Sequence, residues 1–108
     1  MNYRNILIEK IEKLIRGEFS VPQFTDSYYG YFLEEVSQDV LTDIETAFFG
    51  LIQETLDWTV ENPSEEDKKY GYLNYSGYTD WLKENYRRFS ENENLWYSDY
   101  LSSFKRNK

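Results

Sequence analysis

Apolar side chains recur at intervals of three and four residues along most of this 108-residue chain, and this spacing limits what it can fold into. The pattern is clearest in the middle of the chain, where it consists of Leu41, Ile44, Phe48, Leu51, Ile52 and Leu56. Residues three and four apart share one face of an α-helix, so the pattern predicts a helix with a buried face. We expect this helix to begin near Asp39 or at the capping-box sequence Thr42-Asp43-Ile44-Glu45. It should run to about Trp58 and be the most buried helix.

Three further segments show the same period. Residues 6–15 form an amphipathic segment that Gly17 should end. The capping-box sequence Ser20-Val21-Pro22-Gln23 should start a second helix, which keeps the period through Val36. A fourth helix is predicted over about residues 81–89.

The C-terminal part of the chain is less regular. Tyrosine and glycine alternate over residues 70–78, which favours either a loop or a short strand, and Ser76 or Thr79 would cap the helix that follows. Residues 95–104 form either a short fifth helix or a docked tail. Four amphipathic helices with short connections predict an all-α fold, a small antiparallel four-helix bundle in which residues 1–108 make a single domain.

The charge of the chain is distributed very unevenly. Between Gly17 and Asp67 there are thirteen carboxylates and no Lys or Arg, whereas the other residues carry seven acids and twelve bases. These segments contribute −13 and +5, which sum to the formal net charge of −8. Solvated helix faces usually mix the two signs, so a block of one sign favours the attraction of a basic partner. A merely solvated acidic face remains the alternative.

The composition excludes several kinds of chemistry. Without Cys there is no thiolate nucleophile or metal ligand, and without His the commonest general base is missing. The acids do not follow the spacing of a calcium loop, and no glycine-rich phosphate loop precedes a helix. We therefore expect a protein that is not an enzyme and has no cofactor or metal. A small hydrolase with paired carboxylates is a weaker alternative, because no pair stands out among so many acids.

Short apolar runs and the negative net charge also bear on where the protein is located and whether it binds nucleic acid. The apolar runs are short and the N-terminal one meets charge at Glu9, so we expect neither a signal peptide nor a membrane span. Cytoplasm is then the expected compartment. The net charge of −8 argues against direct contact with nucleic acid, because phosphate binding needs clustered Lys and Arg.

Tyrosine is unusually abundant, with eleven residues. They cannot all be core residues, since each buried hydroxyl needs a hydrogen-bond partner, and surface tyrosines are enriched at binding hot spots. The candidates for such a surface are Tyr28, Tyr29, Tyr70, Tyr72, Tyr75 and Tyr78. For any one of them, a partly buried position in the helical core is the alternative.

Several segments in sequence order carry a resemblance to a known family. They are Ile15–Ser20, Gln23-Phe24, Phe48–Ile52, Leu56-Asp57-Trp58, the acidic loop Glu61–Asp67 and the helix around Leu82. In this layout the chain resembles, over about residues 5–89, the bacterial self-protective colicin-like immunity proteins, which include colicin D immunity and contact-dependent growth inhibition immunity proteins. The tyrosine–glycine stretch and the aromatic tail after Phe89 depart from that pattern.

The resemblance implies a small helical protein that binds a cognate toxin domain, often an RNase or tRNase, and blocks its active site. In that family, acids near the end of the third helix and in the following loop stand in for substrate phosphates. The partner-binding residues implied here are Asp57, Glu61, Glu65, Glu66 and Asp67, to which we add the adjoining Tyr70 and Tyr72.

The expected function is therefore that of a bacterial, cytoplasmic immunity protein. It would form a heterodimer with a basic toxin nuclease and cover the active site with an acidic, tyrosine-rich surface. The alternative is an acidic nucleic-acid mimic or adaptor that binds a basic DNA- or RNA-binding protein.

Overall fold

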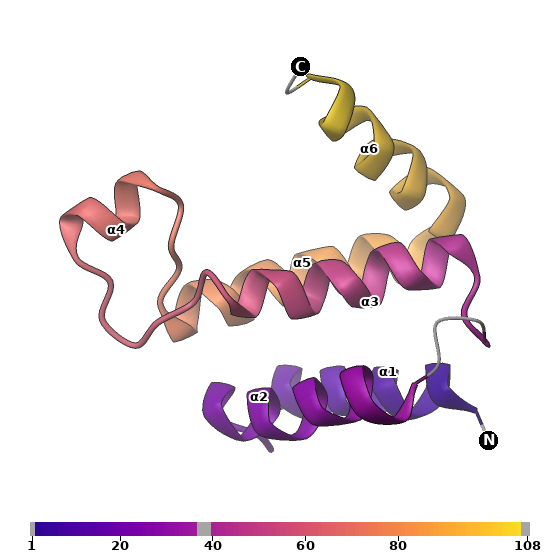
Figure 1. Ribbon diagram of the computed structural model, residues 1–108, viewed down its shortest axis with the longest axis horizontal. Coiled ribbons are helices and arrows are strands. Elements are labelled where there is room, and N and C mark those ends of the chain that lie inside the picture. The colour runs from indigo at the N-terminus through magenta and orange to yellow at the C-terminus, as the bar shows by residue number, and fades with distance from the viewer. Residues whose placement is uncertain (1, 37–39, 107–108) are drawn as a thin grey trace.

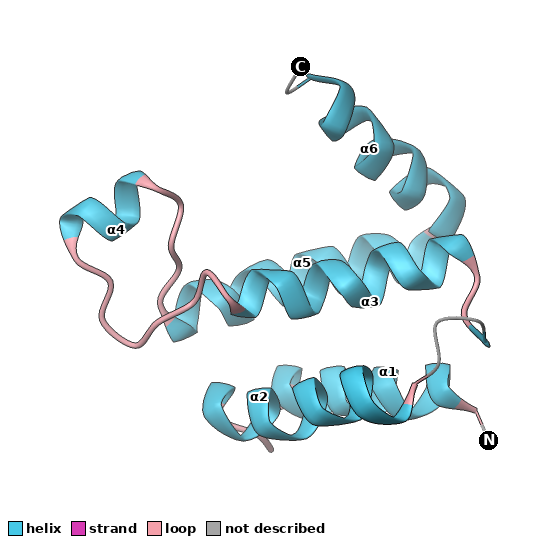
Figure 2. Cartoon of the chain, in the orientation of Figure 1, coloured by secondary structure: helices cyan, strands magenta, loops and turns pink. Residues whose placement is uncertain are grey.

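A computed structural model describes residues 2–36 and 40–106 of the chain. These ranges contain six α-helices and a π-helical turn (Figures 1 and 2). The helices are α1 (Tyr3–Ile15), α2 (Val21–Gly30), α3 (Asp43–Leu56), α4 (Glu65–Lys69), α5 (Tyr75–Glu91) and α6 (Glu93–Arg106), and the π-helical turn is Tyr31–Glu35. The described ranges include no strand, so the predicted all-α class is confirmed. They also include no helix that is both long and apolar enough to cross a membrane.

The long helices form two layers with two projections (Figure 1). Helices α1 and α2 lie side by side in one layer, and α3 and α5 lie side by side in the other. Helix α6 packs against both α3 and α5 where it begins and then leans away from them. Helix α4 sits on a loop that projects at the opposite end of α3.

The core lies between the two layers and extends under the first part of α6. Its fully buried large side chains come from α1, α2, α3 and α5: Leu7, Ile11, Phe24, Tyr28, Phe48, Phe49, Ile52, Tyr78, Leu82 and Phe89. Phe48 stacks on Phe89 with ring centroids 3.8 Å apart, and the Trp96 ring of α6 meets both rings edge-on. Aromatic packing therefore joins α6 to the two layers.

Capping residues set the starts of α2 and α3 as predicted. Ser20 and Thr42 both form complete capping boxes, with Gln23 and Glu45 respectively, so α2 and α3 begin where the sequence places them. The other predicted start of α3, near Asp39, lies outside the described residues.

The predicted helix ends were less accurate. Helix α3 ends at Leu56, with Asp57 as its C-cap, rather than at Trp58. Helix α2 gives way at Tyr31 to the π-helical turn, and Val36 has an extended backbone. Apolar spacing did not predict the end of α2 because it continues past Gly30, where the backbone hydrogen bonds change. In α3 the apolar spacing and the helix both end at Leu56.

The C-terminal part combines the predicted alternatives. The stretch 70–78 is loop up to Asn74, which caps α5 by accepting a 2.7 Å hydrogen bond from the Gly77 amide, so the predicted caps Ser76 and Thr79 were wrong. The last segment is a fourteen-residue helix, α6, and not a short one. It is held by buried Trp96, whose Nε1 donates to Asn85 Oδ1 at 2.9 Å.

Candidate functional site

The candidate site is the segment that connects α3 to α5, residues 58–74, which we call the α4 lobe. Its two ends are joined at the base, where the Val60 amide donates to the Leu73 carbonyl and the Leu73 amide donates to the Trp58 carbonyl, both at 2.9 Å. Beyond this base the lobe projects from the helical layers (Figure 1). No residue of α4 is buried. The side chains of α4 are therefore available to a partner without disturbing the core.

Polar residues cap helix α4 at its N-terminus. Ser64 caps it in a capping box with Asp67, and the two hydrogen bonds between them are each 3.0 Å. Glu65, Glu66 and Asp67 occupy the first turn and two lysines the last turn, which suits the helix dipole. The acids of the lobe thus have a role in local structure, and Asp67 is partly used by it.

The predicted acids differ in whether their carboxylates already have partners within the protein. Glu65 lies 3.3 Å from Lys68 Nζ, and Asp67 is part of the helix cap. Glu61 and Glu66 are exposed and form no ion pair with any side chain in residues 2–36 and 40–103. These two are the lobe carboxylates best placed to meet a cation on a partner.

Asp57 stands apart from the other predicted acids. It lies at the junction of α3 and the lobe, where its Oδ1 accepts a 3.0 Å hydrogen bond from the Tyr29 hydroxyl of α2. That bond to a carboxylate raises the pKa of Tyr29. Asp57 is still exposed, but its contact with Tyr29 means that it also ties the end of α3 to α2.

The predicted tyrosines also fall into different environments. Tyr70 is 70% exposed, and Tyr72 meets the edge of the Trp58 ring with centroids 5.1 Å apart. Tyr28 and Tyr78 are fully buried, so their assignment as surface candidates is corrected. They were misplaced because their hydroxyls find backbone acceptors inside the core, which the sequence does not reveal.

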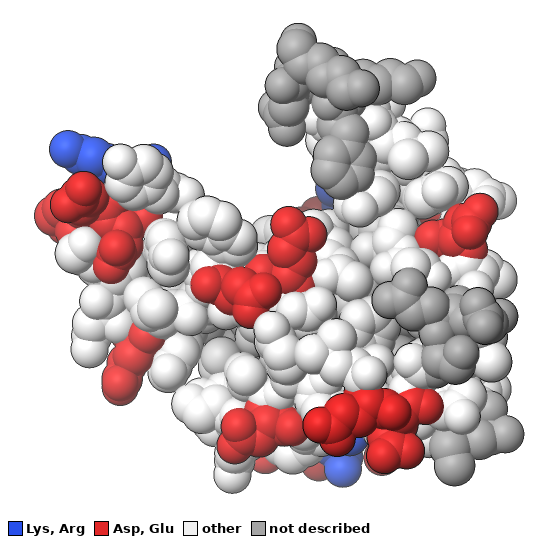
Figure 3. Space-filling view, in the orientation of Figure 1, with Lys and Arg blue, Asp and Glu red and all other residues white. Residues whose placement is uncertain are grey.

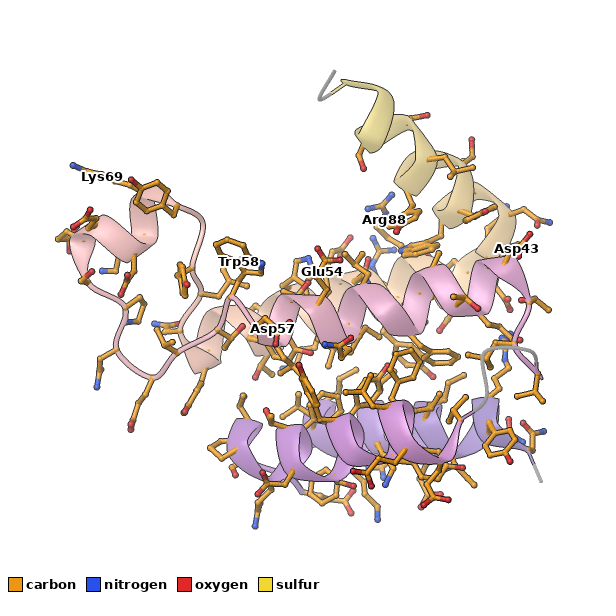
Figure 4. All side chains as sticks on the ribbon, viewed as in Figure 1. Asp43, Glu54, Asp57, Trp58, Lys69 and Arg88 are labelled. Carbon is orange, nitrogen blue, oxygen red and sulfur yellow. The ribbon has the colours of Figure 1, made fainter. Side chains whose placement is uncertain are left out.

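Trp58, the first residue of the lobe, was not among the predicted site residues. Trp58 is 46% exposed, and Figure 4 shows it pointing to the same side of α3 as Glu54. Its position offers a signal that could have identified it, since Trp58 lies beyond the apolar period that ends at Leu56. A large aromatic residue off the buried face and next to several acids is a candidate contact residue.

No family model matches this chain, and no curated protein or solved structure does. The similarity to colicin-like immunity proteins therefore stays a prediction from sequence. What the chain does must be argued from the surface that it presents.

Part of the acidic block is neutralised by cations from outside it. Arg4 of α1 binds Glu45 at 3.1 Å and Glu93 at 2.6 Å, and Arg16 pairs with Glu18. Partial burial opposes ionisation of Glu45, yet hydrogen bonds from Thr42 and Arg4 leave its pKa below the ordinary value. The block identified in the sequence is therefore not uniformly available to a partner.

The visible face of the molecule carries several separate groups of carboxylates and few cations (Figure 3). Between the projecting lobe and α6 this face is hollowed. The segment 57–74 has five acids and two lysines, a formal charge of −3. Within the described ranges, no three acids are grouped so that they could hold a metal ion. The arrangement can attract a basic surface and contact it through aromatic rings.

Proposed function

We propose that this protein is an immunity protein that binds a basic toxin nuclease through the α4 lobe and covers its active site. The observation that carries the proposal is the lobe itself, which projects from the core with exposed Glu61, Glu66, Trp58 and Tyr70. All four side chains are exposed, so burial in the core does not account for these residues. Their types are those that bind cations and form hot spots.

The scaffold in this proposal is an antiparallel four-helix bundle of α1, α2, α3 and α5. Consecutive helices of the two layers run in opposite directions in Figure 1, which puts the connection between α3 and α5 at one end of the bundle. A rigid core then presents the lobe as a preorganised unit, and this limits the entropy lost on binding. The protein would act in the cytoplasm of the bacterium that makes the toxin.

The binding mechanism has two stages. At long range the negative charge of the lobe attracts the cationic groups with which a nuclease holds RNA phosphates, an effect that salt screens. At contact, Glu61 and Glu66 pair with Lys or Arg side chains while Trp58, Tyr70 and Tyr72 are desolvated against the partner. No chemical step is needed, since the nuclease is inhibited by exclusion of its substrate.

The first experiment is co-purification with the C-terminal domain encoded by the gene directly upstream. An RNase assay then compares that domain with and without this protein. Stoichiometric inhibition is the expected result. A nuclease that stays fully active would refute the proposal, and binding to an unrelated basic DNA-binding protein would favour the mimic or adaptor.

The second experiment assigns the surface. The double variant Glu61→Gln/Glu66→Gln removes two charges from the lobe, and Glu34→Gln/Glu35→Gln removes two exposed charges of the same acidic block from the π-helical turn. We expect the lobe variant to associate roughly three- to tenfold more slowly at low salt, and the control variant to change much less. Equal effects of the two variants would show that total charge, and not the lobe, matters.

A further inference from the structure

A pocket of about 510 Å³ lies between the C-terminal part of α1 and the C-terminal half of α5. These two helices pack against each other, behind α2 and α3 in the view of Figure 1. The pocket is separate from the α4 lobe, since no residue of the segment 58–74 lines it. Its volume is within the range of sites that hold small organic ligands, roughly 300–1,000 Å³.

The walls of this pocket are mainly apolar. Ile15 of α1 and Tyr86 of α5 line it, and both are half-buried. The Tyr86 hydroxyl donates to Glu12 Oε2 at 3.0 Å, so the polar end of this side chain already has a partner and its ring is left as apolar surface. The methylene groups of Lys83 and Arg87 add to that surface. A hydrocarbon group that covered these walls would be stabilised by removal from water.

The lining of the pocket carries more positive than negative charge. It has three cations and two acids, a formal charge of +1 in a chain whose net charge is −8. Both acids already accept hydrogen bonds, Glu12 from Tyr86 and Glu91 from Arg87 Nη1 at 2.6 Å. Arg87 also pairs with Glu84, so its charge is met within α5. The unmet positive charge therefore belongs to the other two cations of the lining.

These two cations are Lys83 of α5 and Arg16 at the end of α1. Lys83 is exposed and forms no ion pair with any side chain in residues 2–36 and 40–103. Arg16 pairs with Glu18 through Nε, and over the same ranges its Nη1 and Nη2 donate no hydrogen bond. Both side chains are long, exposed and part of the lining of one pocket. A carboxylate at the rim can accept hydrogen bonds from them, and the guanidinium fork matches its geometry.

Walls and charges together select one class of ligand. The apolar walls require a hydrocarbon group, which an inorganic anion lacks. The formal charge of +1 matches a single negative charge, and Glu12 and Glu91 would repel a second one. A cationic head group would be repelled by Lys83 and Arg16. The matching ligand is an anion with one charge and an apolar tail.

We propose that this pocket binds a monocarboxylate with a hydrocarbon tail, such as a medium-chain fatty acid. The carboxylate accepts hydrogen bonds from Lys83 Nζ and from the free guanidinium nitrogens of Arg16, while the tail covers Ile15 and the Tyr86 ring. The inference goes beyond the proposed function, because it concerns a surface other than the α4 lobe and requires no toxin.

The test is a titration of the free, ¹⁵N-labelled full chain with octanoate, followed by NMR. We expect saturable shifts of the backbone amides of Ile15 and Tyr86. The amide of Gly71, in the α4 lobe, is the internal reference and should not shift. Octan-1-ol has the same tail without the charge, and butyrate has the same head group with a shorter tail. Both should bind several-fold more weakly than octanoate, and octylammonium should bind more weakly still.

Variants then assign the head-group contacts. Lys83→Gln and Arg16→Gln should each weaken octanoate binding about two- to fivefold, the effect of an exposed charge pair, and leave the binding of octan-1-ol unchanged. Lys69→Gln removes the same charge from the α4 lobe and is the matched control, which should bind octanoate as the parent does. All three residues are exposed, so the substitutions should leave the fold intact.

Three outcomes of these titrations would overturn the proposal. Equal affinity for octanoate and octan-1-ol would show apolar surface without a carboxylate site. Equal effects of Lys83→Gln and Lys69→Gln would show that only net charge matters. Shifts that do not saturate and that extend to Gly71 would show nonspecific, detergent-like binding.

Thermal unfolding supplies an independent readout. A ligand that binds the folded state raises Tm, so octanoate should raise the Tm of the parent and of Lys69→Gln by more than that of Lys83→Gln. A Tm of the parent that octanoate leaves unchanged or lowers would contradict a site on the folded protein.

Discussion

Tyr28 of α2 and Tyr78 of α5 both form hydrogen bonds to α3. The buried Tyr28 hydroxyl donates to the Phe49 carbonyl oxygen at 2.8 Å, and the buried Tyr78 hydroxyl donates to that of Ile52 at 3.0 Å. The two acceptors are three residues apart on α3, so hydrogen bonds from both neighbours meet within one turn. This contact accounts for two tyrosines that are fully buried in the core.

The two tyrosines predict a loss of stability at alkaline pH. Burial raises the pKa of both hydroxyls well above the ordinary value of about 10. Because the folded state holds these protons more tightly than the unfolded chain, their stabilising effect is complete below about pH 10 and is lost as the pH rises above it. Urea unfolding followed by circular dichroism should show a free energy of unfolding that falls steeply in that range.

Tyr78→Phe tests the origin of this loss. Removing the hydroxyl should lower the free energy of unfolding by about 1 kcal/mol at neutral pH and should make the alkaline loss smaller. Tyr70→Phe, at an exposed position, is the matched control and should change neither. An alkaline slope as steep as the parent's in Tyr78→Phe would contradict the assignment.

Acid sensitivity is predicted from the pair of Arg4 and Glu45. The pKa of Glu45 is depressed in the folded state, so its stabilising effect is present above the unfolded pKa of about 4.3 and is lost as the pH falls through the lower folded value. Glu45→Gln can keep the capping box but loses the charge. We expect it to cost about 0.5 to 1 kcal/mol at neutral pH, since Arg4 is one-third exposed and the pair is partly screened.

The measurement for Glu45→Gln is denaturant unfolding at neutral and acid pH. The difference between parent and variant should shrink as the pH falls through the pKa of Glu45. Glu66→Gln removes an exposed carboxylate that has no ion pair with the side chains of residues 2–36 and 40–103, and it should have little effect at either pH. A difference that stays constant with pH would rule out a role for the Glu45 charge.

Substitution by alanine should change the stability of the protein in opposite directions at two glycines. Gly71 has a φ of +90°, which alanine adopts only with strain, whereas Gly50 lies inside α3 with open space where an alanine methyl group would lie. Gly71→Ala should destabilise the protein by about 1 kcal/mol, and Gly50→Ala should stabilise it by about 0.5 to 1 kcal/mol. Thermal unfolding of both variants checks the signs, and a neutral Gly71→Ala would mean that the lobe unfolds separately from the core.

Removal of the α4 cap should loosen the lobe without affecting the core. Ser64→Ala deletes the hydroxyl that accepts from the Asp67 amide, a change worth about 1 kcal/mol for a helix start. Since α4 buries no side chain, we expect faster hydrogen exchange of the α4 amides and little change in global unfolding. Equal loss of protection in α3 would show that the lobe supports the core.

Local patterns in the sequence predicted much of the fold. The starts of α2 and α3 follow from capping boxes at Ser20 and Thr42, in which partners only three residues apart satisfy one another. The start of α4 at Ser64 is equally local, although the segment Glu61–Asp67 was expected to be a loop. Helix ends were harder to predict, because at Tyr31 the backbone changes to a π-helical turn while the apolar spacing continues.

The sequence by itself determined the all-α class, the starts of α2 and α3 and the concentration of acids between Gly17 and Asp67, because these depend on neighbours along the chain. Only the tertiary structure decided which of those acids are free. Arg4 reaches Glu45 across 41 positions of sequence, and Asn85 meets Trp96 across the angle between two helices. Such contacts depend on how the layers pack, and no spacing along the chain encodes them.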